Sequence, residues 1–193
     1  MFNSASNYGW VSRLLHWVMA VAVVAMFALG LWMRELDYYS PYYQIAPNLH
    51  KSFGIVLFLL LTVRLIWNMA NPKPYHDGLS PMVRTASKLG HAVLYCLLFI
   101  LMIAGYFIST ADGRPIVVFS TVEVPAVITK KGLEATAGLI HYYVAFAIIG
   151  LSILHASAAL YHHFVKKDNV LRSMMVGKTK SRPIGKKTKS ASL

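Results

Sequence analysis

Histidines at regular intervals are the residues of this chain whose chemistry and spacing stand out. The segment LIHYYVAFAIIGLSILHASAALYHHF, residues 139 to 164, is apolar and long enough to cross a bilayer, yet it contains four histidines. In a helix, the fourteen residues between His141 and His155 rise about 21 Å and return to within about 40° of one face. Because ionisable residues inside a membrane span usually mark function, this spacing predicts two functional layers, one near each membrane surface.

Other apolar segments supply histidines at the same two depths. His50 begins the second segment at the depth of His141, while His16 and His91 lie at the depth of His155. Neutral imidazole is a common axial ligand of haem iron, and helix bundles hold cofactors between facing side chains. The layers predict two b haems, each between two histidines. The outer pair is His50 with His141, and depth alone allows His155 to pair with either His16 or His91.

A second spacing of fourteen residues supports this arrangement. Fourteen positions after His16, His50 and His91 lie Gly30, Arg64 and Gly105, respectively. A glycine lets a flat porphyrin approach the backbone, and an arginine pairs with a haem propionate. The plainer alternatives are helix packing for the glycines and snorkelling of Arg64 to the inner interface.

Covalent haem attachment and other metal sites fit the sequence poorly. The chain has one cysteine and no CxxCH motif, so any haem is held non-covalently. Zinc or di-iron sites in helix bundles use carboxylates or cysteines beside the histidines, and the apolar segments contain no carboxylate. Haem is therefore favoured over a non-haem metal.

Four apolar segments predict an all-α membrane protein, a four-helix transmembrane bundle within one domain over residues 1–175. The predicted spans are about 14–34, 50–70, 91–109 and 139–164, each near the ~20 residues that a spanning helix needs. A hydrophobic content of 56% agrees with membrane insertion. Of the connections, residues 34–49 hold Pro41 and Pro47 as helix breakers, and residues 109–138 contain a β-prone run, VFSTVEVPAV, expected to form a small cap.

The charge distribution predicts the orientation. The net charge is +12, and nine of the nineteen Lys and Arg residues lie at or beyond Lys166, with residues 176–193 forming a basic tail. Since Lys and Arg collect on the cytoplasmic side, both termini are expected there. Such a tail also fits an anionic lipid surface, whereas no motif for nucleic acid is present, so nucleic acid is not an expected partner.

Taken together, these residues resemble the bacterial four-helix cytochrome b561 family from about Tyr8 to Met175. The resemblance rests on the His141 to His155 spacing and on an ordered set of motifs. These motifs are RLLHW (13–17), LHKSFGIVL (49–57), KLGHAVLYCLLF (88–99), GYFISTADGRPI (105–116) and ALYHHFVKKDNVLRSMM (159–175).

The resemblance implies a dihaem electron carrier of the bacterial inner membrane. Family members take one haem ligand from each of the first two spans and two from the fourth. Carried over, the ligands are His16, His50, His141 and His155, with His16 paired to His155. This pattern selects His16 over His91, which then takes a second role.

The family is also linked with ubiquinone, which suggests a role for His162. This residue lies one heptad beyond His155, near the cytoplasmic surface. An imidazole there provides a hydrogen bond and a proton route for a quinone head group. The alternative is that His162 snorkels to the interface.

Two functions follow from the resemblance, and no catalytic side chain is assigned in either. Some relatives oxidise superoxide on the periplasmic side and reduce ubiquinone, which would make the chain a superoxide:ubiquinone oxidoreductase. The alternative is a subunit without catalysis of its own that docks a periplasmic redox protein or a dehydrogenase or hydrogenase complex. A positive patch would favour superoxide, although ordinary solvated loop charge explains the same residues. Exposed outer aromatic residues would favour docking, although anchoring at the membrane interface is the simpler explanation of them. The patch would comprise Lys51, Arg114, Lys130 and Lys131, diluted by Asp112, Glu123 and Glu134, and the aromatic residues are Tyr38, Tyr39, Tyr42, Tyr43 and Phe119.

Overall fold

A computed structural model describes residues 2–4, 7–72, 74 and 79–176. Its helices and strands follow in the order α1 (Trp10–Trp32), α2 (Ile45–Ala70), α3 (Pro81–Thr110), β1 (Ile116–Val118), β2 (Val122–Val124), α4 (Leu133–Phe164) and α5 (Val170–Met175). Within these residues, four helices are long and apolar enough to cross a membrane, which confirms the predicted fold class. Nearly all of the predicted basic tail lies outside the described residues.

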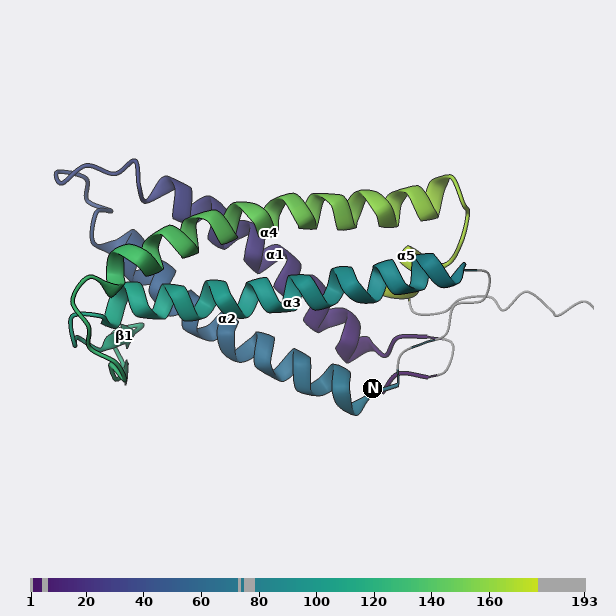
Figure 1. The fold of residues 1–193 in the computed structure, drawn as a ribbon, viewed down its shortest axis with the longest axis horizontal. Coiled ribbons are helices and arrows are strands. Elements are labelled where there is room, and N and C mark those ends of the chain that lie inside the picture. Colours follow the sequence, from purple (N-terminus) through teal and green to yellow (C-terminus); the bar gives the residue numbers. More distant parts are fainter. Residues whose placement is uncertain (1, 5–6, 73, 75–78, 177–193) are drawn as a thin grey trace, which may run out of the picture.

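The four long helices form two helical hairpins. Helix α1 packs mainly on α2, and α3 packs mainly on α4, with a smaller contact between α2 and α3. Figure 1 shows α3 and α4 running side by side along their length while α1 crosses behind them at an angle. Side chains from the two hairpins therefore face each other across the middle of the bundle.

The exterior of the bundle is apolar and its protein core is small. Five buried residues form the core cluster: Met19, Leu57, Leu61, Leu98 and Ile148. Large apolar side chains point outward from every long helix, including Val21, Leu59, Ile103 and Leu154. Such a surface is stable in lipid, where each helix satisfies its own backbone hydrogen bonds.

Helices α3 and α4 are longer than the predicted spans. Helix α3 begins at Pro81, after Ser80, whose hydroxyl accepts a hydrogen bond from the backbone N–H of Val83 at 3.3 Å. With 30 and 32 residues, α3 and α4 exceed the ~20 residues needed to cross the hydrocarbon core. Hydropathy marks the part of a helix that lipid covers, so the polar ends were missed.

The expectation that Pro47 interrupts the chain before the second helix is wrong. Helix α2 already begins at Ile45, and Pro47 lies in its first turn. Backbone N–H groups in a first turn have no partner within the helix, so proline costs little there.

The β-prone run forms a hairpin at one end of the bundle. Strands β1 and β2 pair antiparallel, and the connecting residues Phe119 and Ser120 have φ values of 46° and 59°, as a tight hairpin turn requires. The backbone N–H of Phe119 donates to Ser52 Oγ at 3.0 Å, and its ring lies 5.2 Å from that of Phe53. The expected cap is thus fixed to the start of α2, and we call this the outer end.

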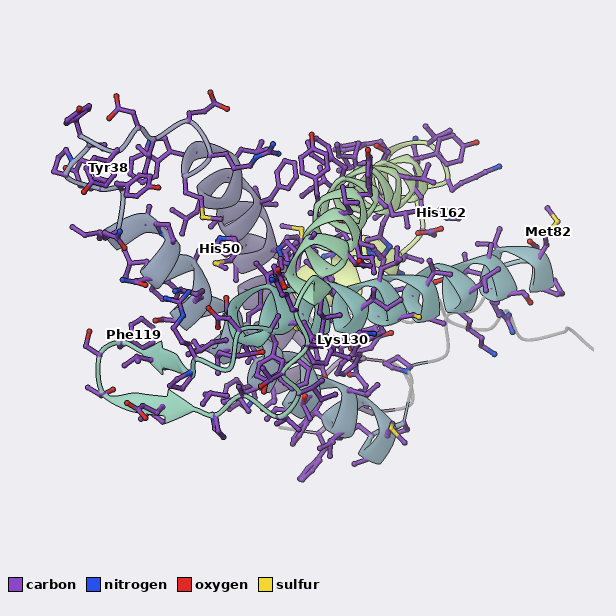
Figure 2. The ribbon with its side chains drawn as sticks, turned by 60° about the vertical axis from the view of Figure 1, so that its left-hand side comes forward. Tyr38, His50, Met82, Phe119, Lys130 and His162 are labelled. Atoms are coloured by element: carbon purple, nitrogen blue, oxygen red, sulfur yellow. The ribbon has the colours of Figure 1, made fainter. Side chains whose placement is uncertain are left out.

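The opposite end, called the inner end, holds the N-terminal segment and α5 (Figure 1). Arg13 Nη1 donates to the Met175 carbonyl at 3.0 Å, and Trp17 Nε1 donates to the Met174 carbonyl at 3.1 Å. Figure 2 shows Tyr38 and Phe119 on the side of the molecule opposite to Met82. The start of α1 and the end of the described chain therefore share one end, as an even number of spans requires.

Candidate functional site

Two pairs of histidines bridge the helical hairpins. His50 of α2 and His141 of α4 have ring centroids 6.2 Å apart, and their planes meet at 70°. His16 of α1 and His155 of α4 have centroids 6.3 Å apart, also at 70°. Each pair takes one residue from each hairpin, so the molecule repeats one arrangement at both ends of α4.

This separation suits a six-coordinate iron. An ion bound by two imidazole nitrogens at about 2 Å on opposite sides places the ring centroids about 6 Å apart. A protein-only metal cluster is a poorer fit, because no group of three or more His, Cys, Asp or Glu side chains placed to hold a metal occurs among the described residues. The two pairs therefore fit haem, whose porphyrin supplies the remaining ligands.

His91 lies in the inner layer but at a different distance. Its ring centroid is 4.9 Å from that of His155, which is too close for an iron bound on both sides. Its Nδ1 hydrogen-bonds the Ser87 carbonyl one turn earlier, at 2.7 Å. Depth in the membrane left this choice open, and the distances between ring centroids favour His16 over His91 as the partner of His155.

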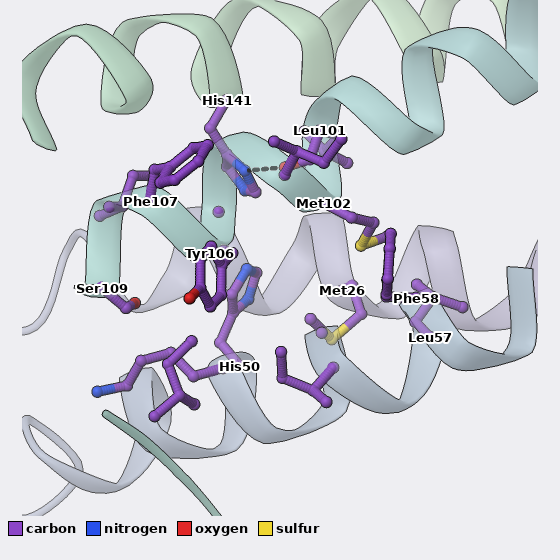
Figure 3. Close-up of a pocket in the computed structure, with 18 of the residues that line it drawn as sticks. Met26, His50, Leu57, Phe58, Leu101, Met102, Tyr106, Phe107, Ser109 and His141 are labelled. Atoms are coloured by element: carbon purple, nitrogen blue, oxygen red, sulfur yellow. Dashed lines mark hydrogen bonds between the residues drawn. The ribbon is translucent and has the colours of Figure 1, made fainter. Parts of the chain in front are cut away.

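The outer pair lies in a large apolar cavity. Figure 3 shows His50 and His141 pointing toward each other from opposite sides, with Met26, Phe58 and Met102 nearby. The cavity has a volume of about 1670 Å³ and is lined by all four long helices and the hairpin. Typical cofactor sites occupy ~300–1,000 Å³, so this one has room for a porphyrin.

The hydrogen bonds of the outer pair also suit a metal. His141 Nδ1 lies 2.9 Å from the Leu101 carbonyl, which only accepts, so Nδ1 carries the proton and Nε2 keeps its lone pair. His50 Nδ1 is buried and has no hydrogen-bond partner within the described part of the chain. These histidines fit the haem that the sequence predicts.

The inner pair has polar surroundings. Arg64 Nη2 lies 2.8 Å from His16 Nδ1, and the guanidinium lies 5.6 Å from the centre of the Tyr95 ring. Asn68 Nδ2 donates to the Tyr95 hydroxyl at 2.7 Å. Arg64 therefore points into the bundle toward the inner pair, and does not snorkel outward.

His162 is held by a residue that the sequence did not single out. Its Nδ1 hydrogen-bonds one carboxylate oxygen of Asp168 in the turn between α4 and α5. The second Asp168 oxygen accepts the backbone N–H of Val170 at 3.1 Å. Asp168 follows Lys166 and Lys167, so the sequence presented it as part of a charged turn; only the fold of that turn brings it to His162.

The charges predicted for the outer end do not act as one patch. Arg114 contacts the Asp112 carboxylate at 2.5 Å, and these hydrogen bonds hold the pKa of Asp112 below its ordinary value. Lys51 and Arg34 line the outer cavity, whereas Lys130 and Lys131 are outside its lining. Of the four expected cations, Lys51 and Arg114 therefore line the cavity, and Arg114 is paired with Asp112.

Two contacts that the sequence did not predict involve residues that line the cavity. The Arg34 guanidinium lies 4.7 Å from the centre of the Tyr142 ring. Tyr106, which lines the cavity, donates its hydroxyl to the Pro125 carbonyl at 2.7 Å and accepts from Val127 N–H at 2.8 Å. Tyr106 thus ties the chain after the hairpin to α3.

A four-helix membrane bundle with facing histidine pairs is the architecture of a membrane b-type cytochrome. The model of one family, prokaryotic cytochrome b561, matches residues 7–177. The chain therefore belongs to the prokaryotic cytochrome b561 family, a multi-pass bacterial membrane protein of electron transfer that binds b-type haem.

Named relatives cover nearly the same length. The chain is 46% identical over 181 residues to "Cytochrome b561 homolog 2" of Escherichia coli K12, covering 93% of this chain and 96% of that protein. It is 31% identical over 166 residues to "Probable superoxide oxidase CybB" of Yersinia pestis, covering 83% and 91%. These relatives confirm the predicted resemblance.

Proposed function

We propose that the chain is a dihaem cytochrome of the bacterial inner membrane that passes single electrons from a periplasmic donor to the quinone pool. The observation that carries the proposal is the repeated histidine pair, with centroids 6.2 Å and 6.3 Å apart at opposite ends of the bundle. Bound haem supplies the one-electron chemistry, and the protein supplies its ligands, burial and placement.

The proposed ligands are His50 with His141 at the outer site and His16 with His155 at the inner site. With two imidazoles at each iron, no position would be open for oxygen, and the bound haem would exchange electrons through its edge. At the inner site, the proposed partner of a haem propionate is the Arg64 guanidinium. Its buried Nε, which has no hydrogen-bond partner within the described residues, supports this role.

The orientation proposed from charge puts the inner end in the cytoplasm with both termini. The inner end carries Arg84, Lys88, Lys166, Lys167 and Arg172, as cytoplasmic segments do. The hairpin and the outer cavity then face the periplasm, where an external donor reaches them.

Superoxide is the donor that the outer cavity supports best. Asp112 is the acidic side chain among the described lining residues, and Arg114 pairs with it, so Arg34 and Lys51 leave the cavity net positive. A positive, low-dielectric cavity attracts a small anion and raises its rate of capture. The likeness to a probable superoxide oxidase supports the same donor.

Ubiquinone is the proposed acceptor at the inner end. Each superoxide that becomes dioxygen gives one electron, so two of them and two protons convert one quinone to its quinol. His162, with Nδ1 held by Asp168, has Nε2 left to bond a quinone oxygen and to pass a proton.

One observation favours docking of a protein donor as the second candidate. Tyr38 and Tyr39, at the outer end, are 78% and 91% exposed, and so contribute little to packing within the chain. Exposed tyrosines are common in interfaces, so a periplasmic redox protein or a dehydrogenase or hydrogenase complex would fit here.

Stopped-flow absorbance tests the proposal directly. Purified, haem-loaded, oxidised protein is mixed with superoxide while the haem spectrum is recorded. About two b haems per chain and reduction near ~10⁸ M⁻¹s⁻¹, slowed by salt, would support superoxide as donor. Two haems with slow reduction would favour a protein donor, and a protein that takes up no haem would overturn the assignment of every histidine.

A further inference from the structure

Two glycines lie directly against the imidazoles of the outer pair. A Cβ at Gly30 of α1 would come within 3.2 Å of His50 Cε1. A Cβ at Gly105 of α3 would come within 3.0 Å of His141 Cε1 and 3.1 Å of its Nδ1. Contacts of this length are tighter than nine in ten that real Cβ atoms make, so an alanine at either position would require the imidazole to shift by a few tenths of an ångström.

These contacts are specific to the outer histidines. Each histidine rests on the other helix of its own hairpin, α2 on α1 and α4 on α3. By contrast, a Cβ added at Gly54, Gly90, Gly138 or Gly150 would meet nothing within 4 Å. At Gly30 and Gly105, the atoms of the described residues that an added Cβ would meet within 4 Å belong to the two imidazoles. Close approach of two helix backbones, the usual reason for glycine in membrane helices, therefore does not explain these two positions.

Gly105 also exposes the carbonyl that holds His141. In α3, the carbonyl of Leu101 is one turn before Gly105 and accepts the N–H of that residue in the helix. The same carbonyl accepts from His141 Nδ1 at 2.9 Å. A side chain at position 105 would stand in the path of the imidazole, because its Cβ would be 3.1 Å from Nδ1.

We propose that Gly30 and Gly105 are positioning residues for the outer axial ligands. They seat the two imidazoles of the outer pair and limit how each ring can turn, and their main purpose is not to clear space for the porphyrin. The inference rests on the proposed function in one respect, that His50 and His141 ligate the outer haem. Gly105 has the larger role, since its neighbour is also held by a hydrogen bond.

Both features have electronic consequences at the iron. The angle between two imidazole planes sets the magnetic anisotropy of a low-spin ferric haem. A hydrogen bond from Nδ1–H to a carbonyl makes the imidazole a stronger donor, which favours the ferric state. Losing that bond in G105A should raise the ratio of reduced to oxidised outer haem about fivefold at a fixed ambient potential.

The test compares full-length, haem-loaded G105A, G30A and G150A by electron paramagnetic resonance and redox titration. G150A is the matched control, since Gly150 lies within α4 with open space around its Cβ position. G105A should change the outer haem's resonance and raise its potential, leaving the inner haem as in the wild type. G30A should change the resonance less, because His50 Nδ1 has no bond to lose within the described residues. An outer haem with wild-type resonance and potential in G105A would overturn the inference.

A second measurement applies if G105A does not retain the outer haem. Histidine ¹⁵N resonances of haem-free protein report the Nδ1–H bond of His141, identified through H141Q. Loss of that resonance in G105A but not in G150A would support the proposed role of Gly105 in positioning His141. Its retention in both variants would overturn that role. Failure of the proposed function would look different from failure of this inference. If His141 does not bind the outer haem, H141A should keep that haem, whatever the result for G105A.

Discussion

The outer and inner histidine pairs share one geometry and differ in what surrounds them. Both have ring planes at 70° and nearly equal centroid separations. The outer pair lies in an apolar cavity, where a carbonyl and two glycines position the rings. The inner pair lies beside a buried guanidinium, with a tyrosine and an asparagine close by.

This difference is expected to give electron flow a direction. A positive guanidinium beside a haem iron at the inner site would stabilise the reduced state, whose net charge is less positive. At an effective dielectric constant near 20, a unit charge about 8 Å away contributes about 2 kcal/mol. The carbonyl bonded to His141 works in the opposite sense by favouring oxidised iron at the outer site. We therefore expect the inner site to hold the electron more tightly, which draws electrons from the outer end to the inner end.

Removing one histidine ligand should have the largest effect, because it should empty one haem site and leave the other filled. H141A should lower the haem content from about two to about one per chain by emptying the outer site, and H155A should empty the inner site. Pyridine haemochrome assay with redox titration measures which haem remains.

H91A is the control for that experiment. Because the His91 ring is only 4.9 Å from that of His155, we expect this variant to keep both haems. Loss of the inner haem in H91A together with its retention in H16A would reverse the inner ligand assignment.

The positions of the helices and of the outer pair could be predicted from sequence because they depend on simple periodicities. Apolar segments and histidine depth predicted four helices, and His50 and His141 do face each other. Depth did not separate His16 from His91, since rotation of each helix about its axis decides which ring reaches 6.3 Å and which reaches 4.9 Å. The family pattern selected His16, and the distances favour the same residue.

Contacts between distant backbone and side-chain atoms could not be predicted from sequence. For the glycines at positions 30 and 105, the sequence left porphyrin approach and helix packing open, and it gave no sign that the nearest protein atoms belong to imidazoles. The bond between His162 and Asp168 depends on how the chain turns after α4, and no periodic pattern encodes that turn. Likewise, the pairing of Arg114 with Asp112 removed a cation that the sequence counted toward an open patch.

The next largest effect is expected at the inner end, on the rate of electron transfer to quinone. H162Q should slow reoxidation of reduced protein by ubiquinone about tenfold or more, because a hydrogen bond and a proton route are lost. D168N should have a similar but smaller effect through the orientation of His162. Stopped-flow haem absorbance gives these rates.

The neighbouring histidine supplies the matched control. The His163 ring packs beside that of Phe164, so H163Q should reoxidise at the wild-type rate. Equal rates in H162Q and H163Q would remove His162 from the quinone site.

Neutralising Arg64 should reduce the contrast between the two sites. R64Q should lower the potential of the inner haem and shift its ratio of reduced to oxidised form by about tenfold or more at fixed ambient potential. R64K keeps the charge and should shift it less. An inner potential that is unchanged in R64Q would mean that the guanidinium does not set the direction of electron flow.

A cation at the outer cavity should have a moderate effect on the rate of superoxide capture. K51Q should reduce the second-order rate a few-fold and weaken its dependence on salt, since Lys51 lines the cavity. K130Q is the control, because Lys130 lies outside the lining. Equal losses in both variants would indicate a general surface field, with no contribution specific to the cavity.

The smallest effect concerns the ion pair beside the same cavity. D112N should release Arg114 and raise superoxide capture about twofold. Because Arg114 lowers the pKa of Asp112, the carboxylate stays ionised at neutral pH, and the pair is lost only as pH falls through that lowered pKa. The ratio of the D112N rate to the wild-type rate should therefore stay constant between about pH 6 and pH 9. A ratio that approaches one toward pH 6 would show that Asp112 titrates in this range, and the cavity would then be more positive in acid than the ion pair implies.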